Sequence, residues 1–171
     1  MINRVFLLAT LLWCALGAAA ATATAETRVA LVLGNSAYQS TTQLANPLND
    51  ARDMSAALKS SGFDVVEALD ADKRKLDGAL RSFAEKLTRA DIALFFYAGH
   101  GLQVGAQNFL IPIDAKLERE RDLEFEAVRF RADDPCRGLE DEVARPRTLK
   151  CVSHIRVVQE EIAGKAVRAQ V

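Results

Sequence analysis

A histidine that stands between two glycines is the clearest candidate for chemistry in this sequence. His100 lies between Gly99 and Gly101, shortly after the apolar run 92–97, which reads IALFFY. Glycines give up packing and backbone entropy, and in return they let other groups approach closely. The imidazole could act as a general acid and base, and the Gly101 amide could donate to a developing oxyanion. The same residues also fit a plain turn with a solvent-facing histidine, so the spacing alone leaves both interpretations open.

The chain before this histidine predicts alternating strands and helices. Short apolar runs bounded by turn residues predict strands over residues 28–33, 63–69 and 92–97. Helices are expected to begin at Asn46-Pro47 and at Asp72, each followed by apolar residues spaced by three and four. Such alternation indicates right-handed crossovers and chemistry at the carboxyl ends of parallel strands. We therefore expect an α/β fold, a three-layer sandwich with a mostly parallel sheet.

The first 25 residues have the pattern of a secretory signal peptide. Residues 5–17 are apolar apart from Thr10, and Ala23-Thr24-Ala25 fits the rule for cleavage before Glu26. An uncleaved anchor is the alternative, but a core of roughly a dozen apolar residues falls short of the ~20 that span a bilayer. We therefore expect a secreted or periplasmic protein with no membrane attachment after cleavage.

The composition is that of one soluble globular domain. The chain has 171 residues, of which 50% are hydrophobic and 26% charged, and its formal net charge is -1. This balance lacks the basic excess of a nucleic-acid-binding protein. Neither a G-x-G-x-x-G motif nor a P-loop follows a predicted strand, which argues against a nucleotide-binding domain.

Three motifs together resemble a known family. They occur in the order GNSAY at 34–38, LNDA at 48–51 and FFYAGHG at 95–101. Residues 28–108 are similar to the large-subunit half of caspase-like cysteine peptidases, and most of all to the metacaspase-related bacterial members. The resemblance implies a caspase-like fold, incomplete at its carboxyl-terminal side, that acts on peptides or proteins.

The resemblance also implies roles for particular residues. A thiolate attacks the scissile carbonyl in this family, and His100 would protonate the leaving amine. Asp50 would line a pocket for Arg or Lys, although an acid in the first turn of a helix is also favoured by the helix dipole alone. Ala98 stands where metacaspases usually have a serine that lines the same pocket. No cofactor or metal site is expected, and a need for calcium, which some metacaspases show, is left open.

The nucleophile is the weakest part of the resemblance. Asp134-Pro135-Cys136-Arg137 resembles the Asp-x-Cys-Arg motif of bacterial members, so Cys136 is the candidate nucleophile. It lies 36 residues after His100, against about fifty in the caspase signature. A disulfide to Cys151, 15 residues further on, is the alternative, and closing that loop would contribute about 3 kcal/mol in the chain-entropy model.

The chain changes character after the histidine motif. Residues 102–104 and 108–111 predict a small hairpin closed by Pro112. From 116 to 150, however, 19 of 35 residues are charged, and no further buried strand is expected. Residues 156–171 could form a terminal helix or a frayed tail. A frameshifted or truncated reading of a longer gene would explain the change.

We thus expect a signal peptide at 1–25, a caspase-like domain at 26–128 and a divergent, poorly ordered charged segment at 129–171. The expected function is cysteine-type endopeptidase activity, with cleavage after Arg or Lys. The alternative is an inactive caspase-like module that binds a peptide or protein, or a truncated product that lacks the nucleophile. The oligomeric state stays undetermined.

Overall fold

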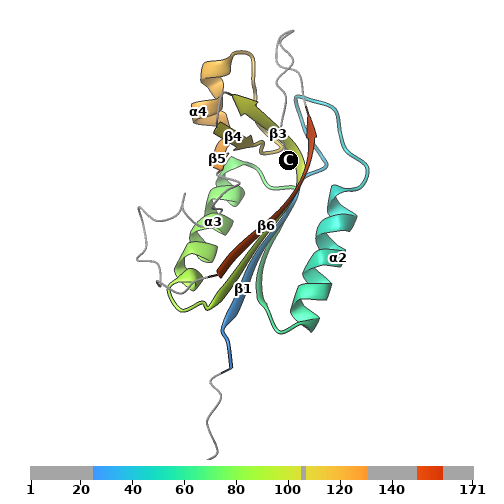
Figure 1. Ribbon diagram of the computed structural model, residues 1–171. Coiled ribbons are helices and arrows are strands. Elements are labelled where there is room, and N and C mark those ends of the chain that lie inside the picture. Colours follow the sequence, from blue (N-terminus) through green and yellow to red (C-terminus); the bar gives the residue numbers. More distant parts are fainter. Residues whose placement is uncertain (1–24, 105–106, 131–149, 160–171) are drawn as a thin grey trace, which may run out of the picture.

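A computed structural model describes residues 25–104, 107–130 and 150–159, and in the last segment the side chains of 150–152 only. The described residues form a six-stranded sheet with helices on both faces (Figure 1). The elements are β1 (Arg28–Gly34), α2 (Pro47–Ser60), β2 (Asp64–Leu69), α3 (Lys73–Leu87), β3 (Ile92–Val104), β4 (Gln107–Leu110), η1 (Glu120–Asp122), α4 (Leu123–Glu126), β5 (Val128–Phe130) and β6 (Lys150–Gln159).

The sheet is mostly parallel, as the alternation of elements predicts. Its order is β2-β1-β3-β4-β5, and β6 pairs with β3. β2, β1, β3 and β6 run parallel, whereas β4 and β5 are antiparallel to their neighbours. The predicted α/β fold class is therefore confirmed, and so is the hairpin that joins β3 to β4.

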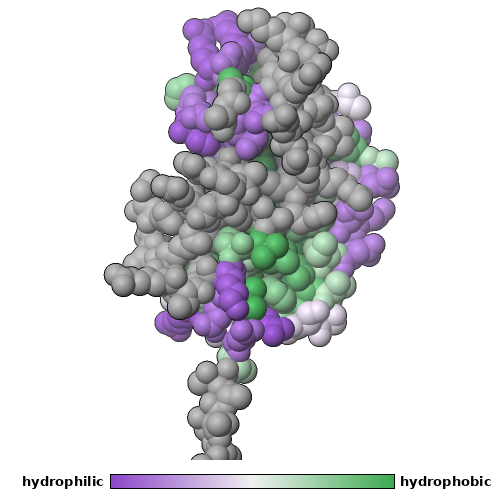
Figure 2. Space-filling model, viewed as in Figure 1, coloured by the Kyte–Doolittle hydropathy of each residue, from purple (hydrophilic) through white to green (hydrophobic). Residues whose placement is uncertain are grey.

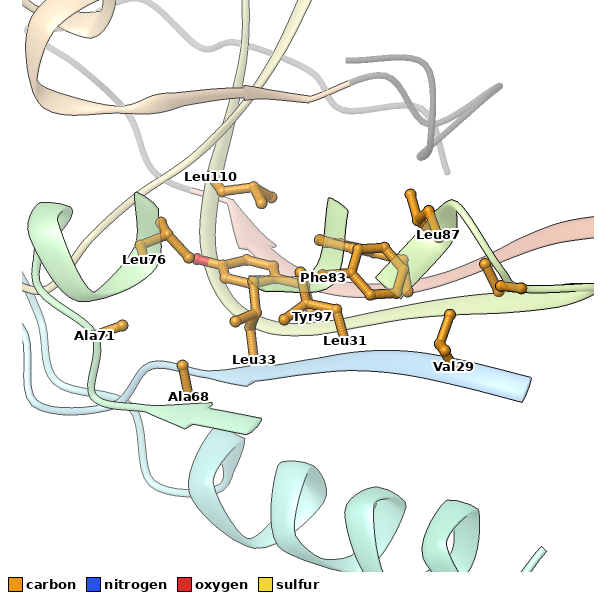
Figure 3. Packing of buried hydrophobic residues seen from close by; sticks show 13 residues of the cluster. Val29, Leu31, Leu33, Ala68, Ala71, Leu76, Phe83, Leu87, Tyr97 and Leu110 are labelled. Carbon is orange, nitrogen blue, oxygen red and sulfur yellow. The ribbon is translucent and has the colours of Figure 1, made fainter. Parts of the chain in front are cut away.

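Alternate residues of β1 pack against the two helical layers. Val29, Leu31 and Leu33 belong to the apolar cluster that contains Phe83 of α3. Ala30 and Val32 share a second cluster with Ala51 and Leu58 of α2. Because successive side chains of a strand point to opposite faces, β1 fills both halves of the core. Figure 3 shows the α3 side of this core, with Tyr97 of β3 packed among the same residues.

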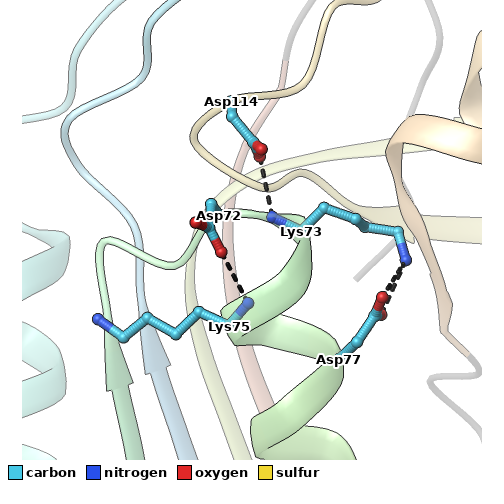
Figure 4. A network of polar contacts seen from close by, with 5 residues as sticks. All are labelled: Asp72, Lys73, Lys75, Asp77 and Asp114. Atoms are coloured by element: carbon cyan, nitrogen blue, oxygen red, sulfur yellow. Dashed lines mark hydrogen bonds and ion pairs between the residues drawn. The ribbon is translucent and has the colours of Figure 1, made fainter.

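The start of α3 is tied to the loop that follows β4. The Asp72 carboxylate accepts the Lys75 backbone N–H at 2.7 Å and caps the helix. Asp114 accepts the Lys73 backbone N–H at 2.9 Å, and the Lys73 ammonium pairs with Asp77 at 2.7 Å (Figure 4). The loop after β4 is therefore fixed at the carboxyl end of the parallel strands.

β3 is much longer than the predicted strand 92–97. Its first residues pair with β1 up to Ala98. From Gly101 onwards, β4 pairs with the same edge of β3. The sequence suggests an end near residue 97 because the two glycines break the apolar run. The structure continues the strand because β4 supplies a new hydrogen-bonding partner there.

β6 was not predicted, and it corrects the expected helix or tail for residues 156–159, which belong to this strand, whereas 160–171 lie outside the described residues. Residues 150–159 run parallel to β3, from Ile92 to Gly101, on the edge opposite β1. Polar residues interrupt the apolar ones of this strand, so it lacks the run typical of a central strand. Such a composition is tolerated where a strand has only one partner, as β6 has in the described part of the chain.

The surface in Figure 2 shows an apolar area between the lower part of β6 and α2. Within the part of the chain that the structure describes, the exposed large hydrophobic residues are Phe125, at 78%, and Val152 of β6, at 54%. Among the described residues, no helix is long and apolar enough to cross a membrane. The expected signal peptide at 1–25 lies almost entirely outside the described residues.

The core leads to a prediction about stability. Phe83→Ala removes a ring with 0% exposure, so the free energy of unfolding should fall by about 3–5 kcal/mol. Phe125→Ala removes the same ring from a surface position and should change it by no more than about 0.5 kcal/mol. Denaturant unfolding measures both, and equal losses would contradict the assignment of α3 to the core.

Candidate active site

Asn35 joins three segments at the carboxyl edge of the sheet. Its backbone N–H donates to the Ala98 carbonyl at 2.9 Å. Its side-chain Oδ1 accepts the Ala71 N–H at 2.9 Å, and its Nδ2 donates to the Ile111 carbonyl at 3.1 Å. The side chain is fully buried, so these bonds replace water. The asparagine of the GNSAY motif therefore holds the loop after β1 against β3.

Asp70 holds the same loop from the other side. Its Oδ1 accepts the backbone N–H groups of Ser36 and Ala37, at 2.8 and 2.9 Å. Its backbone adopts φ 45°, in the left-handed region, where Asp is more common than most residues. Asp70 was not predicted as a site residue, because the only signal in the sequence is an acid directly after the strand β2.

His100 is buried, with 2% exposure, so the interpretation as a solvent-facing histidine is wrong. Its Nε2 lies 2.7 Å from the carbonyl oxygen of Thr42, in the loop after β1. A carbonyl only accepts, so Nε2 carries the hydrogen, and in the neutral ring Nδ1 has the lone pair. The Tyr38 ring packs on the imidazole with centroids 4.4 Å apart and planes tilted by 58°.

Two tyrosine hydroxyls contact the backbone of His100. The His100 N–H donates to the Tyr38 hydroxyl at 2.7 Å, and the Tyr97 hydroxyl donates to the His100 carbonyl at 2.6 Å. The two hydroxyls lie 3.3 Å apart. Burial raises the pKa of Tyr97 well above its ordinary value, and the neighbouring Tyr38 adds to this effect, so the Tyr97 phenol stays protonated.

Gly101 lies inside the sheet, opposite Leu110 of β4 and Gln159 of β6. The His100 carbonyl accepts the Ile111 N–H at 3.2 Å, on the β4 edge. Because successive residues of a strand direct their backbone groups to opposite edges, the Gly101 N–H faces the carboxyl end of β6. At that edge Gly101 is paired with Gln159 of β6, and its use as an oxyanion donor stays a prediction.

Asp50 lies in the first turn of α2, partly buried. This turn packs directly on Gly34, where a Cβ would meet the Ala51 Cβ at 2.6 Å and the Pro47 carbonyl oxygen at 2.7 Å. Gly34 pairs with Ala98, two residues before His100. The turn that carries Asp50 is therefore at the same edge of the sheet as the histidine, and its role in a substrate pocket stays a prediction.

Cys151 is disulfide-bonded, so it presents no thiol in this state. It pairs with Ala93, seven residues before His100 on β3. At about 3.3 Å per residue, this places Cys151 ~23 Å from the histidine, at the opposite end of the parallel strands. Cys136, the candidate nucleophile, lies outside the described residues, as does Cys14.

Acidic, histidine and cysteine side chains do not gather as a metal site in residues 25–104, 107–130 and 150–152. The chemistry that the described residues support is proton transfer by a buried, oriented imidazole.

A mostly parallel α/β sheet that holds a buried, carbonyl-bonded histidine beside the end of the β1–β3 ladder is the arrangement of a caspase-like cysteine peptidase. Residues 27–144 match the family model of the caspase domain, which is more than two thirds of the chain. The chain belongs to this family.

Two curated relatives match over part of the chain. Mucosa-associated lymphoid tissue lymphoma translocation protein 1 from Homo sapiens is 33% identical over 91 residues, which is 53% of this chain and 11% of that protein. Its homolog from Mus musculus has the same identity and coverage. The chain thus spans about a tenth of the length of these relatives.

The role of Asn35 yields a second prediction. Asn35→Asp keeps Oδ1 but replaces the amide donor by an oxygen that faces the Ile111 and Ala71 carbonyls. The free energy of unfolding should fall by about 2–3 kcal/mol, because buried acceptors lose their donor. Asn49→Asp, at an exposed position in the first turn of α2, is the matched control and should be neutral or slightly stabilising. Equal losses in both variants would contradict the role assigned to Asn35.

Proposed function

We propose that this chain is a cysteine endopeptidase in which His100 transfers the proton between the nucleophilic thiol and the leaving amine. The observation that carries the proposal is the 2.7 Å contact from Nε2 to the Thr42 carbonyl. It selects the tautomer whose Nδ1 can accept a proton, and it stabilises the imidazolium that forms next. A solvated histidine would not be held in one orientation and one tautomer by such a contact.

The reaction follows from this tautomer. Nδ1 accepts the thiol proton, and the thiolate attacks the carbonyl carbon of the scissile bond. The imidazolium gives that proton to the amine nitrogen as the C–N bond breaks, which leaves a thioester. Water then attacks the thioester with the imidazole as base, releasing the acid and restoring the thiol. The Gly101 amide is the proposed donor to the oxyanion of both steps.

Cys136 is the proposed nucleophile. It lies within the part of the chain that matches the caspase family model, whereas Cys151 lies outside it and is disulfide-bonded. A reducing agent is needed in the assay, so that any disulfide that involves Cys136 is opened.

The test is turnover of fluorogenic peptides ending in Arg, Lys or Asp by the purified chain, with and without reducing agent and calcium. We expect His100→Ala and Cys136→Ala each to lower kcat by at least about 100-fold. His154→Ala and Cys151→Ala are the matched controls, and both should retain turnover. Activity that survives in His100→Ala and Cys136→Ala would overturn the proposal.

We further propose that Asp50 selects a basic residue at the cleaved position. Asp50→Asn should lower kcat/KM for Arg peptides by about 10-fold, corresponding to ~1.4 kcal/mol, and leave uncharged peptides unaffected. Asp53→Asn removes the same charge from an exposed position of α2 and is the control. Equal effects of the two substitutions would point to long-range charge rather than to a pocket.

An inactive caspase-like binding module is the second candidate. The sequence of β6 favours this candidate. The strand ends beside Gly101 with Val157-Val158-Gln159, and its cysteine lies at the opposite end, so β6 brings no thiol to the histidine. In that case the folded chain should bind an Arg-containing peptide, measured by fluorescence anisotropy, without cleaving it. Binding that is unchanged in Cys136→Ala, together with no turnover, would support this candidate.

We also propose export to an oxidising compartment. The disulfide at Cys151 supports this location, because disulfides persist in secreted and periplasmic proteins and are rare in the cytosol. Expression of the full chain in a bacterial host, followed by sequencing of the mature amino terminus, should give a start at Glu26. Retention of residues 1–25 in the exported protein would contradict cleavage.

A further inference from the structure

His100 lies at a gap in the hydrogen bonding of β3. β1 pairs with β3 only as far as Ala98, and β4 pairs from Gly101 onwards. The His100 N–H therefore has no strand partner on this edge and donates to the Tyr38 hydroxyl at 2.7 Å. A side chain from the loop after β1 takes the place of a strand at this position.

The hydroxyls of Tyr38 and Tyr97 close a ring on the histidine backbone. Tyr97 has one hydroxyl proton, and its shortest acceptor is the His100 carbonyl, at 2.6 Å. This leaves Tyr38 as the donor in the 3.3 Å contact between the two hydroxyls. Hydrogen bonds thus run from the His100 N–H through Tyr38 and Tyr97 to the His100 carbonyl. We name this arrangement the tyrosine ring.

Gly99 is required by the tyrosine ring. A Cβ at this position would lie 2.6 Å from the Tyr38 hydroxyl and 2.7 Å from the Tyr97 hydroxyl. Real Cβ atoms do not approach oxygen so closely, and neither hydroxyl could move without losing its bond to His100. The first glycine of the G-H-G motif therefore makes room for two buried hydroxyls.

We propose that Tyr38 and Tyr97 are positioning residues that set the imidazole of His100 in the orientation and tautomer that the proposed peptidase reaction needs. This inference rests on the proposed function only for the catalytic role of the imidazole. Tyr38 contacts the histidine twice, through its hydroxyl on the backbone and its ring on the imidazole. The loop that carries Tyr38 also supplies the Thr42 carbonyl, so one segment fixes the backbone, the ring plane and the protonated nitrogen.

The test reads the imidazole directly, without relying on turnover. Nitrogen-15 NMR of histidine-labelled protein reports which ring nitrogen carries the proton, and His154→Gln assigns the signals because the chain has only two histidines. Wild type should show Nε2–H at neutral pH. Tyr38→Phe and Tyr97→Phe should each produce a mixture of the two tautomers, and Gly99→Ala should do the same. Thermal unfolding identifies variants that fail to fold.

Ser55→Ala is the matched control. Its hydroxyl is buried in α2 with 1% exposure and has no hydrogen-bond partner among the described groups, so its removal should leave the imidazole signals unchanged. Where turnover is present, Tyr38→Phe should lower kcat about 10- to 100-fold with KM within about twofold, since misplacement of a catalytic group acts on the chemical step.

The outcomes separate this inference from the proposed function. Folded Tyr38→Phe and Tyr97→Phe proteins with the wild-type imidazole spectrum would overturn the positioning role, even if the chain is an active peptidase. A change of tautomer in a chain without turnover would support the tyrosine ring and count against the peptidase. A similar spectral change in Ser55→Ala would also overturn the inference, because it would show a general response to lost buried hydroxyls.

Discussion

The geometry of this protein's site depends on the buried amide of Asn35. Its side chain accepts from the segment after β2 and donates to the segment after β4, while its own N–H binds the end of the β1–β3 ladder. Three connections that are remote in sequence are thereby held at one edge of the sheet. A hydrophobic side chain of equal size could fill the same space, but it would leave these carbonyl and N–H groups without partners.

The position of the histidine side chain depends on that arrangement. Asp70 and Asn35 fix the start of the loop after β1, and the loop then brings Tyr38 and the Thr42 carbonyl to His100. The group that binds Nε2 of the imidazole is therefore a backbone carbonyl. A side-chain partner would add its own rotamer freedom, whereas a carbonyl moves only if the loop moves. This reliance on loop position explains why two separate side chains hold the loop.

The sequence predicted the layers of the fold well, because apolar periodicity reports burial directly. The strands β1 and β2, the helices α2 and α3 and the hairpin after His100 all followed from such patterns. β6 was missed because its polar residues hide a strand that has one partner in the described chain. Of the site, His100 could be found from its glycines. The Thr42 carbonyl could not be found, because every residue has a backbone carbonyl and no residue type marks the one that binds His100. Asp70 could be noticed only as one more acidic residue beside a strand.

Tyr97 belongs to two parts of the molecule at once. Its ring packs with Leu76 and Phe83 in the α3 side of the core, and its hydroxyl binds the backbone of the histidine (Figure 3). Opening the site at this point would therefore require exposing core surface, which places the His100 amide in the most cooperative unit of the protein. Hydrogen exchange at that amide would follow global unfolding rather than local opening. This part of the site is therefore held as firmly as the core itself, in contrast to many active-site loops.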